Sequence, residues 1–216
     1  MSLNRTAPAR FPSVRRALLR VHADLFKIGA QMRLDLFPAQ LSELEIMVLI
    51  SEDRRFFRHH GFDIKSIARE MFRMLTFRRH GGASTIDMQL VRTITGYRER
   101  TASRKLYEML LAWLIQYRYN KFEILRSYLS CAFLGSHVTG MDNAAVKVFG
   151  KARHLLSIEE SARLAAMLVY PRPLTPTIVW ENKIKRRANY IIRLYPKMKK
   201  RFEKLPIPEF RDRLGP

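Results

Sequence analysis

The sequence predicts an all-α protein with a single domain. Apolar residues recur at the three- and four-residue spacing of helices, and the alternation of Val and Ile that is typical of strands is scarce. Two Ser-x-x-Glu patterns, at Ser42–Glu45 and Ser157–Glu160, are capping boxes that predict helix starts. The 216 residues, of which 47% are hydrophobic and 27% charged, suffice for one globular domain with a sizeable core.

The N-terminal region is predicted to hold a basic amphipathic helix. Residues 1–12 are polar with two prolines, and we expect them to be disordered. After Ser13, apolar residues fall at helical spacing beside three arginines: Val14, Leu18, Val21, Leu25 and Ile28, with Arg15, Arg16 and Arg20. This helix either lies on a membrane surface or packs on the domain, and Pro38 ends the region.

Two helices are predicted on either side of a charged loop. Ser42 begins a helix that carries Ile46–Glu52, which places Glu52 near the helix end and facing the loop. Ile64–Phe77 is the second helix, and its apolar side chains are interleaved with arginines. That mixture is typical of a core-facing helix with a solvated rim.

The remaining helices follow in the second half of the chain. A long helix is predicted over Arg104–Tyr119, with five large residues facing inward: Leu106, Leu110, Trp113, Leu114 and Tyr117. Glu108 lies off this stripe. Further helices are expected at Glu123–Phe133 and Ile158–Leu168, before Pro171, Pro173 and Pro176 break the chain. Ile184–Leu194 closes the domain, and a basic tail with proline follows.

The charge balance points to a polyanionic partner. With 40 Lys and Arg against 19 Asp and Glu, the net charge is +21, which suits nucleic acid, an anionic membrane or a phosphorylated substrate. We expect no nucleic acid, because there is neither zinc-ligand spacing nor an RNA-binding signature. Cys131 is the only cysteine, so an intrachain disulfide is excluded, and its apolar surroundings predict a buried, inert thiol.

The run Glu52–Asp63 is the most informative part of the chain. An acidic pair stands beside basic and imidazole side chains, the aromatic pair Phe56–Phe57 and Gly61, directly after the apolar run Ile46–Ile50. A carboxylate pressed against an apolar segment loses hydration, so its protonation can be tuned for proton transfer. The flanking cations could hold an anionic substrate. A helix end with solvated charges is the alternative.

A second motif spans Gly82–Arg92. Small residues followed by Ser84 and Thr85 predict a tight loop that caps a helix start. The free backbone N–H groups at such a start attract phosphate, and Ser, Thr, Gln and Arg side chains add donors. Alone, the motif is equally compatible with a loop that only caps a helix.

The two motifs resemble the Glu-Asp-x-x-Phe-x-x-His-x-Gly and Gly-x-Ser-Thr-Ile-Thr-Gln-Gln signatures of the peptidoglycan glycosyltransferases, glycosyltransferase family 51. Three further blocks follow in the family's order. Arg104–Glu108 is similar to Arg-Lys-x-x-Glu, Lys121–Ser130 to Lys-x-x-Ile-Leu-x-x-Tyr-Leu-Asn, and Arg187–Tyr195 more loosely to Arg-x-x-x-Val-Leu-x-x-Met. The resemblance covers residues 41–195 and implies a lysozyme-like helical fold with two lobes around a cleft.

The resemblance implies a monofunctional enzyme that polymerises lipid II into glycan strands, with inversion and release of undecaprenyl pyrophosphate. Glu52 takes the place of the general base and Glu108 that of the second carboxylate. The implied substrate-binding residues are Asp53, Phe56, His59, Ser84, Thr85, Gln89, Arg92, Arg104 and Lys105. Among them the clamp for the pyrophosphate is formed by Arg92, Arg104 and Lys105. His59 is expected to be a structural hydrogen-bonding group, and Arg187 to support the architecture of the cleft.

The second motif departs from the family pattern. Asp87 stands where the family has Thr, and Met88 replaces the first Gln; Arg92, Thr93 and Ser130 replace Lys, Asn and Asn. We expect the charge of Asp87 to weaken pyrophosphate binding. These departures motivate the alternative of a divergent, non-catalytic member that binds lipid II or membranes. Glycan cleavage by a lysozyme-like fold is a third interpretation.

The resemblance also implies an organisation and partners. It divides the chain into a basic arm with the amphipathic helix (1–40), a glycosyltransferase domain (41–200) with a membrane-contacting subdomain (64–80), and a basic tail (201–216). The implied partners are lipid II, the growing glycan chain, an anionic membrane surface and cell-wall synthesis proteins. No cofactor is required and no metal ligands are assigned, although Mg²⁺ or Mn²⁺ near Glu52 is compatible with the family.

The expected location is the outer, periplasmic face of the bacterial cytoplasmic membrane. No run in the sequence approaches the ~18 apolar residues of a membrane span. We therefore expect membrane association without a transmembrane segment in this sequence, either through an anchor outside it or through peripheral binding.

Overall fold

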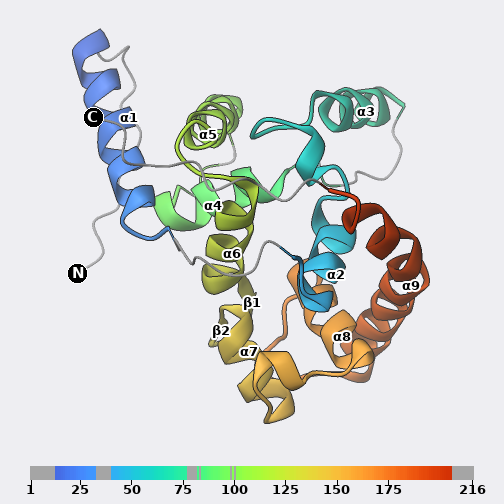
Figure 1. Cartoon of the computed structure of the whole chain (residues 1–216). Helices are drawn as coiled ribbons and strands as arrows, with labels where there is room; N and C mark the ends of the chain where they lie inside the picture. Colours follow the sequence, from blue (N-terminus) through green and yellow to red (C-terminus); the bar gives the residue numbers. More distant parts are fainter. Residues whose placement is uncertain are drawn as a thin grey trace.

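The computed structural model describes residues 13–32, 40–76, 82, 84–97, 99 and 101–205, and these are mostly helical (Figure 1). The helices are α1 Val14–Gly29, α2 Glu43–Glu52, α3 Ile64–Leu75, α4 Ile86–Thr95, α5 Ala102–Ile115, α6 Lys121–Cys131, α7 Met141–Phe149, α8 Ile158–Val169 and α9 Ile178–Phe202. Two 3₁₀ turns, η1 Phe56–Arg58 and η2 Arg153–Leu155, and an antiparallel hairpin of β1 Phe133–Gly135 and β2 Val138–Thr139 complete the elements. The predicted all-α fold class is confirmed.

Helix α2 forms the centre of one half of the molecule. Its residues from Leu44 to Ile50 are all buried, and it packs against α8 and α9 (Figure 1). The predicted capping box begins it: Ser42 Oγ accepts from the Glu45 backbone N–H at 3.3 Å, and the Glu45 carboxylate accepts from the Ser42 N–H at 2.7 Å. Because α2 is enclosed on all sides, the residue at its C-terminal end, Glu52, has a fixed position.

The other half is built on α4, which packs against α5, α6 and α1 (Figure 1). Of the two alternatives for α1, packing on the domain holds for its C-terminal part, where Ile28 is fully buried. Asp24 secures this contact by accepting hydrogen bonds from the hydroxyls of Tyr97 and Tyr107, each at 2.9 Å. The N-terminal part stays exposed, with Leu18 64% accessible.

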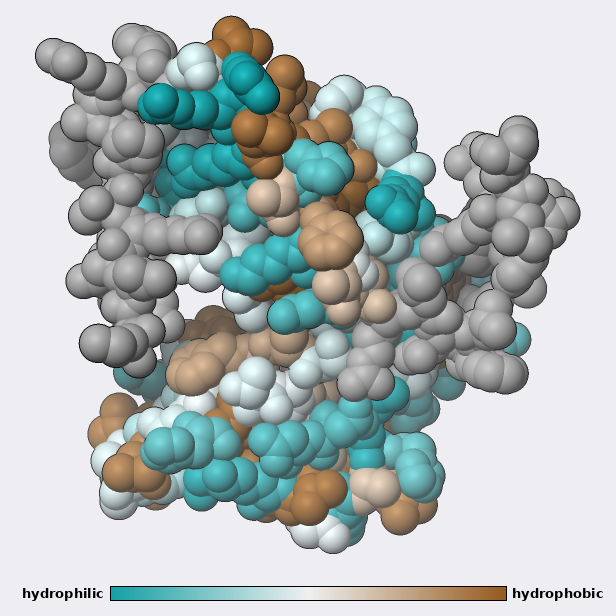
Figure 2. All heavy atoms as spheres, turned by 90° about the vertical axis from the view of Figure 1, so that its left-hand side faces the viewer, coloured by the Kyte–Doolittle hydropathy of each residue, from teal (hydrophilic) through white to brown (hydrophobic). Residues whose placement is uncertain are grey.

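The α1 side of the molecule combines apolar and charged surface. Figure 2 shows this face, where hydrophobic and strongly hydrophilic side chains lie next to one another in the upper part. Exposed apolar residues of α1 are Val14, Leu18, Leu19 and Phe26. None of the helices in the described part of the chain has the length and apolar character needed to cross a membrane.

The predicted inward stripe of the long helix is wrong. Leu106, Trp113 and Tyr117 are 65, 39 and 70% exposed, and Leu110 is exposed as well. The buried face of α5 instead carries Glu108 together with Leu111, Ala112 and Ile115. The helix has apolar residues on two faces, and it packs against α4; the buried Glu108 is paired within α5, with Arg104 one turn earlier.

The closing helix is longer than predicted. Instead of ending at Leu194, α9 continues through Pro196 to Phe202. Proline removes one backbone donor inside a helix, but Tyr195, Met198 and Phe202 bury their side chains on either side of it. This packing holds the last turns in place. The predicted disorder of residues 1–12 and most of the predicted tail fall outside the described residues.

Candidate active site

Glu52 is the last residue of α2, as the capping box predicts, and its partly buried carboxylate meets α4. Gln89 Nε2 donates to Glu52 Oε2 at 2.8 Å, and the Tyr128 hydroxyl donates to Gln89 Oε1 at 2.9 Å. This second bond fixes the orientation of the amide. Burial raises the pKa of Glu52, and the hydrogen bond from Gln89 and the charge of Arg187 only partly oppose that effect. A raised pKa makes this carboxylate a stronger proton acceptor than an ordinary Glu.

The end of α2 is held by the two helices behind it. Arg187 Nη2, from α9, donates to the Ser51 carbonyl at 2.7 Å. The Ser51 hydroxyl donates to the Ala165 carbonyl of α8 at 3.1 Å. A helix end leaves its last carbonyls without partners, and the Arg187 guanidinium supplies one. The position of Arg187 agrees with the supporting role expected from the sequence.

The other residues of the first motif point into the protein. Asp53 accepts from the backbone N–H groups of Arg55 and Ile86 at 3.2 and 3.3 Å, and its Oδ2 lies 2.8 Å from His59 Nε2. Phe56 is fully buried, and Asp53 and His59 nearly so. These side chains therefore tie the loop after α2 to the start of α4.

Gly61 and Thr85 also tie the loop after α2 to the start of α4. Gly61 has φ +82°, and a Cβ there would lie 2.5 Å from the Ala112 backbone, so only glycine lets the loop pass this close to α5. Thr85 Oγ1 donates to the Gly61 carbonyl at 2.6 Å and accepts from the Met88 N–H as the N-cap of α4. Because the Thr85 hydroxyl is buried and both donates and accepts a hydrogen bond, it positions the loop rather than remaining free.

A group of cations comes from two helices: Arg92 stands one turn after Gln89 on α4, and Arg104 and Lys105 lie in the first turn of α5. Lys105 Nζ donates to Ser84 Oγ at 2.7 Å, and Arg104 pairs with the buried carboxylate of Glu108. Burial lowers the pKa of Lys105, and the positive charges of Arg92 and Arg104 lower it further, against the opposing charge of Glu108. The three cations predicted to form a clamp are thus close enough to influence one another. Positive charge exceeds negative charge here, which favours an anionic ligand.

Comparison with known proteins identifies the family. A family model for transglycosylases matches residues 29–195. The chain belongs to the transglycosylase family. This confirms the resemblance drawn from the five motifs and places the protein in a family of glycosyltransferase enzymes.

Individual relatives support the assignment. The chain is 35% identical over 150 residues to a Cupriavidus necator protein named "Putative transglycosylase", covering 69% of this chain and 64% of the relative. It is 34% identical over 148 residues to penicillin-binding protein 1A of Rickettsia typhi and 35% over 156 residues to penicillin-binding protein 1F of Bacillus subtilis. These matches cover 67 and 72% of this chain but only 19 and 21% of the two longer proteins.

Asp87, the main departure from the transglycosylase motif, does not face the substrate loop as expected. It is completely buried, and both its carboxylate oxygens lie within 3.2 Å of Lys121 Nζ; Gln116 donates to it as well. Burial raises the pKa of Asp87 and lowers that of Lys121, and their mutual attraction opposes both changes. The negative charge is therefore neutralised inside the protein. Met88 is likewise fully buried in the core.

The residues near Glu52 do not fit a divalent cation. Within the described part of the chain, one group of three candidate ligands occurs: Asp53, His59 and Asp87, all buried. Lys121 already supplies a positive charge to Asp87, and His59 supplies a hydrogen-bonding partner to Asp53. A divalent ion would have to displace the Lys121 ammonium from its contact with Asp87, so we assign no metal to these three residues.

Sequence reasoning missed three residues that the site uses. Tyr128 belongs to the fourth family block, but nothing in the sequence linked it to Gln89, 39 positions earlier. Lys121 and Gln116, the partners of Asp87, are equally remote. A buried acid at a position where the family has an uncharged residue was the available signal, because it requires a partner.

Proposed function

We propose that this transglycosylase is a peptidoglycan glycosyltransferase that polymerises lipid II, with inversion at the anomeric carbon and release of undecaprenyl pyrophosphate. One observation carries the proposal. A carboxylate with a raised pKa stands at the end of a rigid, buried helix, and the neighbouring helix α4 and the helix α5 packed on it carry a cluster of three cations. A base and a group of cations are the two elements that this transfer requires.

Glu52 would act as the general base. Its Oε2 is engaged by Gln89 at 2.8 Å, whereas its Oε1 has only a long 3.5 Å contact with the Ser51 hydroxyl. We therefore assign proton acceptance to Oε1. The acceptor's sugar hydroxyl gives its proton to this oxygen as its own oxygen forms a bond to the anomeric carbon of the donor.

The cations would stabilise the leaving group. As the bond between the anomeric carbon and the pyrophosphate oxygen breaks, the electron pair leaves with the pyrophosphate. Arg92, Arg104 and Lys105 would neutralise the charge that develops there. Ser84 would orient the Lys105 ammonium through their 2.7 Å hydrogen bond. Glu108 would keep Arg104 in place, so that this second carboxylate acts beside the leaving group.

Contact with an anionic membrane would bring the enzyme to its lipid-linked substrate. The exposed apolar residues Ile64 and Phe72 of α3 lie beside basic side chains, as do those of α1. Such surfaces suit an interface between lipid headgroups and acyl chains. We propose that α1 and α3 rest on the outer face of the bacterial cytoplasmic membrane.

The test is a gel assay of the purified protein with labelled lipid II in detergent. The wild-type protein should produce a ladder of glycan chains, and Glu52→Gln should remove it. Glu159→Gln, which neutralises an exposed carboxylate on α8, is the matched control and should leave the ladder unchanged. Lipid II binding by the wild-type protein without any ladder would instead support the non-catalytic alternative, and soluble fragments from purified cell wall would support glycan cleavage.

A further inference from the structure

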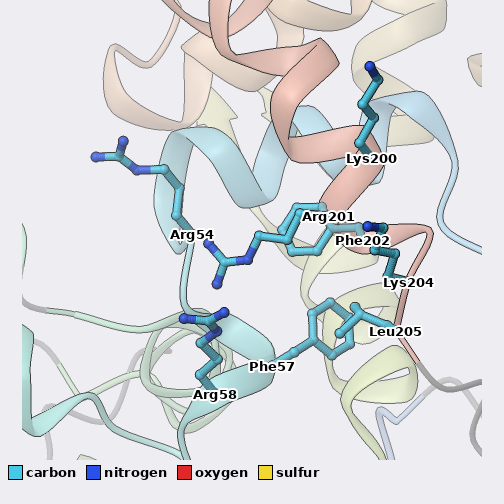
Figure 3. A pocket seen from close by; sticks show the side chains of 8 residues that line it. All are labelled: Arg54, Phe57, Arg58, Lys200, Arg201, Phe202, Lys204 and Leu205. Atoms are coloured by element: carbon cyan, nitrogen blue, oxygen red, sulfur yellow. The ribbon is translucent and has the colours of Figure 1, made fainter.

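The lining of a strongly basic cleft includes neither Gln89 nor the cation group of α4 and α5. The cleft has a volume of about 500 Å³ and is formed between η1 and the C-terminal end of α9. Eight residues in the described part of the chain line it, five cations and three apolar residues: Arg54, Arg58, Lys200, Arg201 and Lys204, with Phe57, Phe202 and Leu205. Figure 3 shows the Arg201 side chain extending from α9 toward the guanidinium group of Arg58. No carboxylate is among the described residues that line the cleft.

The positive charge of this cleft is not paired with carboxylates of the described residues. In the part of the chain that the structure describes, none of the five cations forms an ion pair, whereas neighbouring Arg55 is paired with Asp63 at 2.8 Å. Burial lowers the pKa of Arg201, and the nearby positive charges of Arg58 and Arg55 lower it further. Cations in the last turn of a helix compensate its dipole, but Arg201 reaches across to other cations instead.

The apolar side of the cleft is rigid. Phe57 of η1 packs edge-on against Phe202 of α9 with ring centroids 5.9 Å apart, and it also contacts Phe122 of α6 at 5.4 Å. These contacts fix the distance between the two elements that supply the arginines. The like charges are therefore held together by apolar packing, and an anion between them would relieve their repulsion.

We infer that this cleft binds a phosphate-bearing anion through Arg58 and Arg201, with Arg54 and the two lysines around it. Guanidinium groups on two facing elements suit the tetrahedral arrangement of phosphate oxygens, which accept two hydrogen bonds from each group. The phosphate comes either from a phospholipid headgroup or from a soluble anion. A protein with a net charge of +21 attracts anions in general, and this cleft would add a specific contact to that attraction.

The experiment compares two variants of equal net charge. Arg58→Gln/Arg201→Gln removes the two central cations, and Lys183→Gln/Lys185→Gln removes two exposed cations about 25 Å away along α9. Binding of sodium diphosphate is measured by titration calorimetry. Sedimentation with phosphatidylcholine vesicles, with and without phosphatidylglycerol, measures binding to headgroups. We expect the arginine variant to bind at least one of the two ligands about tenfold more weakly, and the lysine variant to bind like wild type.

The pattern of results identifies the source of the phosphate. Loss of vesicle binding alone assigns the cleft to a headgroup, whereas loss of diphosphate binding assigns it to a soluble anion. Equal effects of the two variants, or no binding of either ligand by the wild-type protein, would overturn the proposal. Arg58→Lys/Arg201→Lys, which keeps both charges but not the guanidinium geometry, should bind with intermediate affinity and guards against misfolding of the glutamine variant.

Discussion

Glu52 and Glu108 are both carboxylates withdrawn from water, yet the protein surrounds them differently. Glu52 is bound by the neutral amide of Gln89, and Arg187, the cation that influences it, is hydrogen-bonded to the Ser51 carbonyl instead. Glu108 is buried more deeply, at 1% exposure, and pairs directly with the Arg104 guanidinium. Thus one carboxylate has a polar, uncharged partner and the other has a cation.

This difference separates the two proposed roles. A carboxylate whose ionised form is poorly compensated has a raised pKa and can exchange a proton during a reaction. A carboxylate in a direct ion pair holds its cation in place. The structure therefore favours Glu52 as the base and Glu108 as the residue that orients Arg104.

The largest effect is expected from neutralising the two carboxylates separately. Glu52→Gln should lower kcat/KM for polymerisation by roughly 10²- to 10⁴-fold, the usual contribution of a general base. In the wild type, kcat/KM should fall as pH drops through the raised pKa of Glu52. The midpoint of this fall, the acidic limb of the pH–rate profile, should lie above the value of about 4.3 for an unperturbed Glu. Glu108→Gln should also lower the rate but keep that limb. If the limb disappeared in Glu108→Gln instead, the two assignments would be reversed.

A second effect should appear in stability. Arg104→Gln leaves the Glu108 carboxylate buried without its direct partner, which should lower the free energy of unfolding by about 3 kcal/mol. The matched control is Arg163→Gln, whose partner Glu181 is exposed, and its cost should stay below about 1 kcal/mol. Urea denaturation measures both. Arg104→Gln/Glu108→Gln should recover part of the loss, and equal stability of the two single variants would refute the contrast.

The orientation of Gln89 offers a finer test. Tyr128→Phe removes the hydroxyl that fixes its amide, at a cost of about 1 kcal/mol and a fall in kcat/KM of roughly fivefold. A less well directed amide stabilises the ionised Glu52 less, so the acidic limb should move to higher pH. Tyr195→Phe loses a comparable bond, to Glu43 at 2.9 Å, and should leave both the rate and the limb unchanged. An unchanged limb in Tyr128→Phe would show that Gln89 does not depend on this bond.

The sequence predicts parts of this site that depend on neighbouring residues. The capping box at Ser42 predicts the start of α2 and places Glu52 at its end, and both are confirmed. The sequence does not predict which face of α5 is buried, because Leu106 and Leu111 lie on different faces that are both apolar. Nor does it predict that Lys121 neutralises Asp87, since that pairing joins two helices 34 positions apart. Contacts between distant segments decide these cases, and no local pattern records them.

The smallest effect concerns the stability of the protein as a function of pH. Because the pKa of Glu52 is raised in the folded state, the folded protein binds more protons than the unfolded chain between the two pKa values. Stability should therefore fall as pH rises from about 4.3 through the folded-state pKa, and stay lower above it. Glu52→Gln cannot ionise, so its stability relative to wild type should increase over this window. Urea denaturation of both proteins across the window measures that difference, with Glu159→Gln as the control. A difference that does not change with pH would show that burial of Glu52 does not disfavour its ionised form, and the contrast with Glu108 would then rest on geometry alone.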